Sequence, residues 1–285
     1  MKFTLNQFND RFPTSNACLE ELKQLRYANF VCPKCDRKDS LSKINGRPQY
    51  ACVCGFQVAP LSGTIFHKSS TDLRTWFMTM YMMSQTRSGV SAKTVERTTG
   101  VTYKTAWRMM KQIRSLMEHD GDLLHGTVEA DETYFKAQAK QDLRLPRNTR
   151  TGDAEVIVGA VERGGRVIAK HVPRASAEYL RGNIIENVHP DYSIVYTDGH
   201  KAYTKLPMYG YKHYTVDHSN LEFTRGDVST QSIENFWRQF KGGMYGVYRH
   251  CSPIYLQNYA NEYAWRFSNR KSEVPMFELL LGKTV

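Results

Sequence analysis

The sequence lacks the features that mark membrane-spanning and exported proteins. It contains no run of about 18 apolar residues, so we expect no transmembrane helix and no membrane partner. The opening segment MKFTLNQFNDRF has no apolar signal-peptide core, which favours a cytoplasmic location. Internal repeats and low-complexity tracts are also missing. Apolar residues make up 41% of the 285 positions and aromatic residues 12%, enough to form one large or several small folded domains.

Cysteine is scarce, but its placement is uneven. Four of the six cysteines fall within 23 residues, as Cys32-Pro-Lys-Cys35 and, sixteen residues later, Cys52-Val-Cys54. Two pairs on tight turns can hold four thiolates tetrahedrally around a structural Zn²⁺, with the strand-like RPQYACV between them. The second pair is one residue shorter than a standard knuckle. The alternative is therefore four free thiols or a site that binds zinc weakly.

Positive charge is in excess and is concentrated in one segment. The chain carries 39 Lys and Arg against 28 Asp and Glu, a net charge of +11. Between Pro60 and Ser115, nine basic residues face two acidic ones, a local net charge of +7. Such an excess suits a polyanionic partner, of which nucleic acid is the usual one.

The basic segment contains the pattern of a helix-turn-helix, in SGVSAKTVERTTGVTYKTAWRMMKQIRSLM (88–117). Ser91 is a suitable N-cap for a first helix, Gly100 closes it, and Thr102 caps a second. Basic and aromatic side chains on the exposed face would contact DNA in a major groove. The alternative is an ordinary helical hairpin with a solvated basic face. The candidate DNA-binding residues are Lys93, Tyr103, Lys104, Arg108, Lys111 and Arg114.

Acidic residues stand out in two strand-like segments. In GTVEADETYF (126–135), Glu129 and Asp131 share one face because strand side chains alternate. Glu129 on that face and Glu132 next to it therefore compete with Asp131 for the role. In SIVYTDGHKAY (193–203), an apolar run ends at Asp198, where a turn would expose the carboxylate. The alternative is that Asp198 serves only the turn.

A third acidic position lies on a predicted helix, in STQSIENFWRQFKGG (229–243). Glu234 borders an apolar stripe with helical spacing, and Lys241 follows seven residues later on nearly the same side. The alternative is that Glu234 pairs with Arg238 on the surface. Together Asp131, Asp198 and Glu234 could hold two Mg²⁺ (or Mn²⁺) ions about 4 Å apart and support phosphodiester cleavage.

These motifs together resemble bacterial insertion-sequence transposases of the DDE type (ISXO-type, related to the Merlin elements). The resemblance covers almost the whole chain and includes CPKC, SGTIFHKSSTDLRTWF, GVTYKTAWRMM, VEADETYF, VYTDGHKAY and IENFWRQFKGG. It implies the acids Asp131, Asp198 and Glu234, with Lys241 contacting DNA near the metal ions. Some relatives carry Asn at the third position, so Asn235 competes with Glu234.

The resemblance implies an RNase H-like α/β fold, a mixed sheet flanked by helices, preceded by a zinc ribbon and a helix-turn-helix. The middle of the chain fits this order, with a strand meander, a crossover helix over ASAEYLRGNIIENV, a parallel strand ending at Asp198, and a fifth strand in YKHYTVDHS. His213 and His218 on that strand are secondary candidates. We expect domains at 1–66, 67–120 and 121–285.

The expected function is binding of terminal inverted repeats, followed by cleavage and strand transfer on target DNA. Joining two ends to one target suggests a homo-oligomer, acting at the bacterial nucleoid. Two alternatives remain open at this point. One is a catalytically inactive, transposase-derived regulator, and the other is an RNase H-like nuclease without strand transfer.

Overall fold

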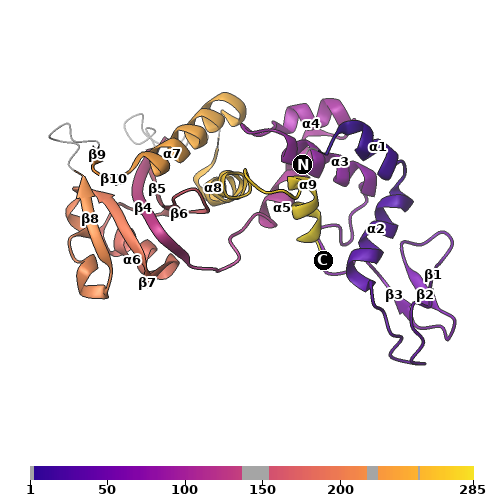
Figure 1. Cartoon of the computed structure of the whole chain (residues 1–285). Coiled ribbons are helices and arrows are strands. Elements are labelled where there is room, and N and C mark those ends of the chain that lie inside the picture. The colour runs from indigo at the N-terminus through magenta and orange to yellow at the C-terminus, as the bar shows by residue number, and fades with distance from the viewer. Residues whose placement is uncertain (1–2, 137–153, 217–223, 250) are drawn as a thin grey trace. The chain divides into compact units, whose positions relative to one another are not determined.

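A computed structural model describes residues 3–136, 154–216, 224–249 and 251–285. Its internal contacts divide the chain into two compact units (Figure 1). The first comprises Met1–Thr86, Ala92–Leu116 and Ser272–Val285, and the second Arg87–Ser91 and Met117–Lys271. The polar, turn-rich segment 143–155, which the sequence predicts to be a loop, lies mostly outside the described residues, as does His218. Within those ranges no helix is long and apolar enough to cross a membrane.

The first unit is mainly helical, and side-chain caps set where several of its helices begin. Thr4, Thr14, Asp72 and Thr102 each accept the backbone N–H three residues on, which satisfies a donor that the first turn leaves unpaired. Gly100, with φ of +75°, ends the first helix of the predicted helix-turn-helix. The helices are α1 (Leu5–Arg11), α2 (Ser15–Tyr27), α3 (Leu73–Gln85), α4 (Ala92–Thr99), α5 (Tyr103–Ser115) and α9 (Met276–Gly282).

The C-terminal helix α9 completes the core of the first unit. Phe277 of α9 is fully buried, and its ring centroid lies 5.1 to 6.3 Å from those of five other aromatic rings. Arg11 of α1 adds an ion pair of 2.5 Å with Glu278. Residues more than 190 positions apart in the sequence thus share one aromatic cluster. The five other rings are those of Phe3, Phe8, Phe12, Phe77 and Tyr81.

A small antiparallel sheet between α2 and α3 carries the cysteines. Its strands are β1 (Leu41–Lys43), β2 (Tyr50–Cys52) and β3 (Gln57–Val58), paired in the order β1-β2-β3. The strand predicted between the cysteine pairs is therefore confirmed as β2.

The second unit is built on a five-stranded mixed sheet of order β6-β5-β4-β7-β8. Antiparallel pairing joins β4 (Leu124–Phe135), β5 (Glu155–Glu162) and β6 (Val167–Val172). The crossover helix α6 (Ala177–Asn187) then brings β7 (Val188–Asp198) parallel to β4, and β8 (Lys212–Val216) lies parallel to β7. The predicted meander, crossover helix and parallel strands are thus confirmed.

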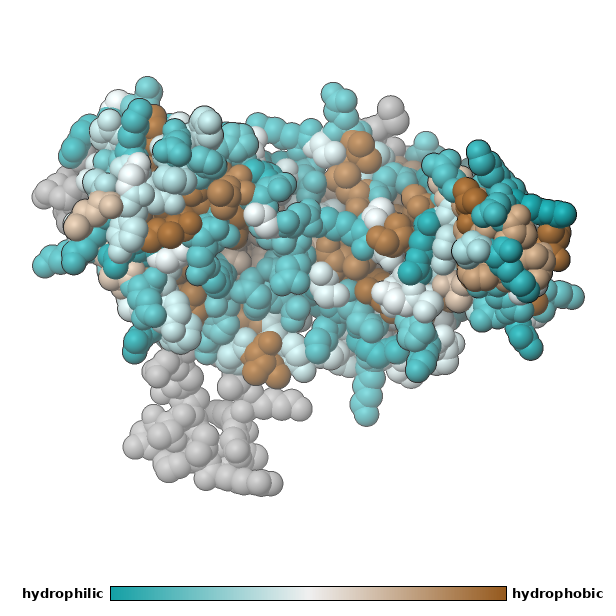
Figure 2. Space-filling view, turned by 90° about the horizontal axis from the view of Figure 1, so that it is seen from below, coloured by the Kyte–Doolittle hydropathy of each residue, from teal (hydrophilic) through white to brown (hydrophobic). Residues whose placement is uncertain are grey.

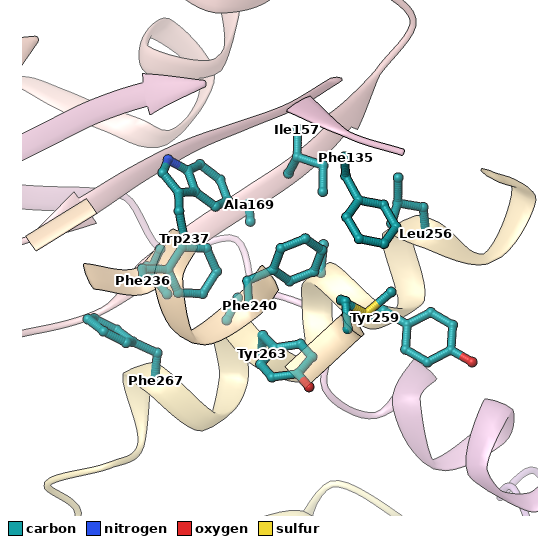
Figure 3. Packing of buried hydrophobic residues seen from close by; sticks show 14 of the residues in the cluster. Phe135, Ile157, Ala169, Phe236, Trp237, Phe240, Leu256, Tyr259, Tyr263 and Phe267 are labelled. Carbon is teal, nitrogen blue, oxygen red and sulfur yellow. The ribbon is translucent and has the colours of Figure 1, made fainter. Parts of the chain in front are cut away.

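Helices cover both faces of this sheet, because apolar residues alternate along its strands. On β5, Val156 and Val158 face the cluster that includes α6, whereas Ile157 and Val161 face the opposite side. There α7 (Gln231–Gly243) and α8 (Pro253–Ser268) pack their aromatic residues against the sheet (Figure 3). The remaining elements are η2 (Lys201–Tyr203), η3 (Leu206–Tyr209), β9 (Thr224–Arg225), β10 (Val228–Ser229) and the π-helical turn η5 (Met244–Tyr248).

The surface contrasts with these apolar interiors. On the face seen in Figure 2, hydrophilic residues predominate and hydrophobic residues form separate groups. Isolated exposed apolar side chains are usual on folded proteins, since polar groups cannot cover the whole surface.

Candidate active site

Asp131 and Asp198 lie on neighbouring parallel strands at matching positions. Each β4 residue from Gly126 to Glu129 pairs with the β7 residue 67 positions later (193 − 126 and 196 − 129 are both 67). The pairing ends at Glu129 and Tyr196, but the same offset of 67 relates Asp131 to Asp198, and the charge of Asp198 acts on Asp131. Asp198 is the last residue of β7. The side chains expected to form the acid pair are therefore brought together by strand register.

The electrostatics of Asp131 reflect this crowding. Burial, together with the negative charges of Glu132 and Asp198, raises the pKa of the Asp131 carboxyl to about 7. Asp198 accepts the backbone N–H of His200 through Oδ1 at 3.1 Å, which is the turn role expected as the alternative. A carboxylate has two oxygens, so the turn leaves the group able to accept a further ligand.

Glu132 adds a third carboxyl group from the opposite face of β4. Its Oε2 accepts a hydrogen bond from the buried Tyr203 hydroxyl at 3.1 Å, on the side covered by α6. Burial and the nearby Asp198 raise the pKa of Glu132. Glu132 was expected only as a competitor of the neighbouring Asp131, and its bond to Tyr203 was not foreseen from the sequence.

Trp237 of α7 holds Asp131 directly. The indole Nε1 donates to Asp131 Oδ2 at 3.1 Å. The ring reaches this position because Gly159, the β5 partner of Asp131, has no side chain. A Cβ on Gly159 would lie 2.7 Å from the Trp237 ring. The sequence identified Trp237 only as part of an apolar stripe, so its polar contact was missed.

Glu129 shares the face of Asp131 but has a different set of partners. Its side chain is fully buried, and Arg163 Nε donates to Oε1 at 2.6 Å. Oε2 accepts the backbone N–H groups of Ser232 and Ile233 at 2.6 and 3.1 Å. Both oxygens are thus engaged within the fold. This favours Asp131 over Glu129 as the acid available to a ligand.

Glu234 and Asn235, the two candidates for the third position of the site, lie on different faces of α7. Glu234 is partly exposed, lies three residues before Trp237 and therefore shares its side of the helix. Its Oε1 accepts from the Thr230 hydroxyl at 2.8 Å. Lys241, seven residues on, is also partly exposed. Asn235 instead belongs to an exposed stripe that includes Gln231, Arg238, Gln239 and Gly242.

Asp131, Glu132 and Asp198 lie close enough for their charges to interact, without forming a closed cage for one ion. Among the described residues, the cysteine cluster is the only group in which three or more metal-binding side chains bring ligand atoms within 4.8 Å of one another. The carboxylates are hard oxygen donors of the kind that Mg²⁺ and Mn²⁺ prefer. Burial and, to a smaller extent, repulsion from Glu132 and Asp198 raise the pKa of Asp131. A divalent cation would offset both, so the donor set fits such ions.

His213, a secondary candidate, lies on β8 within the sheet. Its Nε2 is 2.9 Å from the hydroxyl of Thr197, the residue before Asp198. Burial lowers the pKa of His213. This places the imidazole beside the strand that carries Asp198.

The four cysteines of the first unit form a cluster that could hold a metal ion. Cys32 Sγ lies 3.4 Å from Cys54 Sγ, and Cys35 Sγ lies 3.5 Å from Cys52 Sγ. All four sulfur atoms lie within 4.8 Å of one another. The set offers four soft ligands with tetrahedral capacity, which suits zinc.

A tight turn allows the short second pair to reach the cluster. Cys52 ends β2, and Gly55, with φ of +85°, donates its N–H to the Cys52 carbonyl at 2.8 Å. The backbone N–H of Cys54 and the Ser40 hydroxyl donate toward the Cys52 sulfur and lower its pKa to about 6. These donors favour the thiolate, which is the form that binds metal.

Five of the six candidate DNA-binding side chains are exposed on α4 and α5. They are Lys93, Tyr103, Lys104, Arg108 and Lys111. Lys93 pairs with Glu96 at 2.5 Å, and the same carboxylate accepts the Tyr103 backbone N–H. Arg114 differs, because it is only 3% exposed. It lies four residues after Met110 and therefore on the packed side of α5.

The sheet order, the crossover helix and the two aspartates on neighbouring parallel strands are those of an RNase H-like fold. The chain belongs to the ISXO2-like transposase family, whose domain matches residues 123–268. The matched segment begins just before β4 and ends with α8. It therefore contains Asp131, Asp198 and Glu234.

Individual relatives agree with this assignment. An uncharacterized protein in transposable element ISH50 of Halobacterium salinarum is 28% identical over 233 residues, covering 75% of this chain and 78% of the relative. An uncharacterized transposase-like protein of Haemophilus influenzae is 31% identical over 115 residues, covering 39% and 89%. Among solved structures, a chain of the simian T-cell lymphotropic virus intasome in complex with PP2A regulatory subunit B56 gamma matches weakly. Its TM-score is 0.31 and its sequence identity is 13%. The match covers 66% of this chain and 65% of that chain, so it spans less than two thirds of the length of that chain.

Proposed function

We propose that this transposase cleaves DNA at its element's ends and joins them to target DNA, with Asp131, Asp198 and Glu234 as ligands of two Mg²⁺ or Mn²⁺ ions. The proposal is carried by the placement of Asp131 and Asp198 on neighbouring parallel strands, close enough for the charge of Asp198 to contribute to the raised pKa of Asp131. Two carboxylates on neighbouring parallel strands, together with a carboxylate on α7, would suit a pair of divalent ions.

The protein's own groups would prepare the site for the reaction. The Trp237 N–H orients the Asp131 carboxylate, and Thr230 holds Glu234 one turn earlier on the same side of α7. Lys241 would contact a DNA phosphate beside the acids. When bound, the metal ions would activate the attacking water or 3′-hydroxyl and stabilise the leaving oxygen.

The first unit would select the DNA ends. Exposed basic residues of α5, with Lys93 of α4, would enter a major groove and contact phosphates and base edges. The cysteine cluster would hold a structural Zn²⁺ that keeps the ribbon folded. Because two ends must be joined to one target, the active form would be a homo-oligomer acting on cytoplasmic DNA.

The test is a cleavage and joining assay on labelled duplexes that carry the DNA flanking the coding sequence. Asp131→Asn, Asp198→Asn and Glu234→Gln should each abolish Mg²⁺-dependent cleavage while leaving end binding intact. Asn235→Ala, on the exposed stripe of the same helix, is the matched control and should cleave. End binding without cleavage by the wild type would favour the regulator, and cleavage without joining would favour the nuclease.

A further inference from the structure

Glu129 is a fully buried carboxylate on β4, and each of its partners either belongs to α7 or contacts the residue that lies just before it. Its Oε2 accepts the N–H groups of Ser232 and Ile233, which are two of the donors that the first turn of α7 leaves without helical partners. Arg163 donates to Oε1 of Glu129 through Nε. Its Nη2 donates to both the carbonyl oxygen and the hydroxyl oxygen of Ser229. Ser229 lies two residues before α7 begins.

This network fixes one end of α7 relative to β4. Glu129 and Asp131 are two residues apart on one face of β4, a separation of about 6.6 Å along a strand. Glu129 binds the first turn of α7, and Asp131 binds Trp237 one turn further along. The strand and the helix are therefore joined at two points, and Glu234 lies between them.

We propose that Glu129 is a positioning residue that sets the depth and rotation of α7, and thereby presents Glu234 and Trp237 to Asp131. The inference rests on the proposed function, since it concerns how the third acid is brought to the first. Burying a charge in the protein interior is unfavourable unless it is paired and hydrogen-bonded. Here the three donors to the carboxylate come from Arg163 and from the helix that carries Glu234.

A second buried carboxylate supplies a matched control. Glu262 of α8 is also fully buried, and it pairs with Arg266 at 2.5 Å and accepts from the Tyr248 hydroxyl at 2.7 Å. These contacts are within α8 and to η5. A change from Glu to Gln therefore removes a buried charge in both cases, but only Glu129→Gln alters the start of α7.

The experiment compares the two variants in the full chain, using Mn²⁺ as the probe. Glu129→Gln should weaken Mn²⁺ binding, measured by electron paramagnetic resonance, about 10-fold, the size expected when a group that orients a metal ligand is lost. Amide hydrogen exchange in residues 231–236 should accelerate by a similar factor. Glu262→Gln should bind Mn²⁺ as the wild type does. Both variants should still bind DNA ends, because the helix-turn-helix belongs to the other unit.

The outcomes separate this inference from the proposed function. If Glu129→Gln binds Mn²⁺ like the wild type while Asp131→Asn does not, the positioning role is overturned and the acid assignment stands. If Asp131→Asn also keeps full Mn²⁺ affinity, the acid assignment itself fails. Should Glu129→Gln not fold, Glu129→Asp replaces it, because the shorter side chain keeps the charge but cannot reach both N–H groups. Wild-type Mn²⁺ affinity in Glu129→Asp would then overturn the positioning role.

Discussion

The indole N–H of Trp237 donates to the carboxylate of Asp131 at 3.1 Å, across the contact between α7 and the central strand of the sheet. This bond opposes the burial that raises the pKa of Asp131, because it favours the charged form of the carboxyl group. One aromatic side chain thus packs in the core and orients an acid of the site.

Replacing Trp237 with Phe tests that bond while keeping most of the ring. Losing one donor should raise the pKa of Asp131 further, so cleavage should fall about 2- to 10-fold at pH 7, the size expected for one ordinary hydrogen bond. Activity should recover toward pH 8.5, where the carboxyl is ionised in both proteins. The measurement is the pH profile of cleavage. A uniform loss at every pH would show that packing, rather than the bond, is responsible.

The raised pKa of Asp131 also predicts how stability depends on pH. The pKa of the Asp131 carboxyl is about 7 in the folded protein and 3.8 for an unperturbed aspartate, so the folded state binds the proton more tightly. The contribution of Asp131 to stability is therefore present below pH 4 and is lost as pH rises to 7. The Asn side chain of Asp131→Asn does not ionise, so this variant does not lose stability as the pH rises. In magnesium-free buffer at pH 8 its free energy of unfolding should exceed that of the wild type by about 2 to 4 kcal/mol.

Urea unfolding of both proteins from pH 4 to pH 8 measures this difference. It should widen over that window and narrow again when Mg²⁺ is added at pH 8, because the cation compensates the charge. A difference that stays constant with pH would mean that the Asp131 carboxyl is ionised throughout.

The cysteine cluster predicts one metal ion per chain. Cys52→Ser should abolish bound zinc, measured by elemental analysis, and weaken end binding because the ribbon loses its metal support. Cys251→Ala is the control, since Cys251 is buried in the α7–α8 cluster of the other unit. It should retain zinc. Equal zinc content in the two variants would show that the four-cysteine cluster is not the zinc-binding site.

The helix-turn-helix predicts a phosphate contact through Lys104. Lys104→Ala should weaken end binding several-fold and reduce the slope of log affinity against log salt by about one. Lys170→Ala removes the same charge from an exposed position on β6 and should leave both quantities unchanged. An unaltered salt slope in Lys104→Ala would exclude that residue from the DNA interface.

Much of the fold of the second unit was predictable from the sequence, because the apolar residues of its strands and helices recur with clear strand or helix spacing. Asp198 could be placed at a strand end, and a right-handed crossover predicted the parallel neighbour of β4. Alternation could not separate Glu129 from Asp131, since both share a face, and only the approach of α7 distinguishes them. Helical spacing did contain the signal for Arg114, four residues after Met110, although its charge suggested the surface.

Contacts between distant segments were not predictable from local pattern. The burial of Phe277 among rings near the N-terminus joins segments hundreds of residues apart, and no local period encodes that. The bond from Arg163 to Glu129 was hidden for the same reason, because Arg163 lies in a turn whose sequence shows only a charged residue beside glycines.

The most direct test of the central claim is single-turnover cleavage and joining on duplexes carrying the flanking DNA, in Mg²⁺ and without it. The wild type and Asn235→Ala should cut and join only with Mg²⁺. Asp131→Asn, Asp198→Asn and Glu234→Gln should bind the same ends but leave them uncut. Cleavage by Asp131→Asn or Asp198→Asn at the wild-type rate would contradict the central claim.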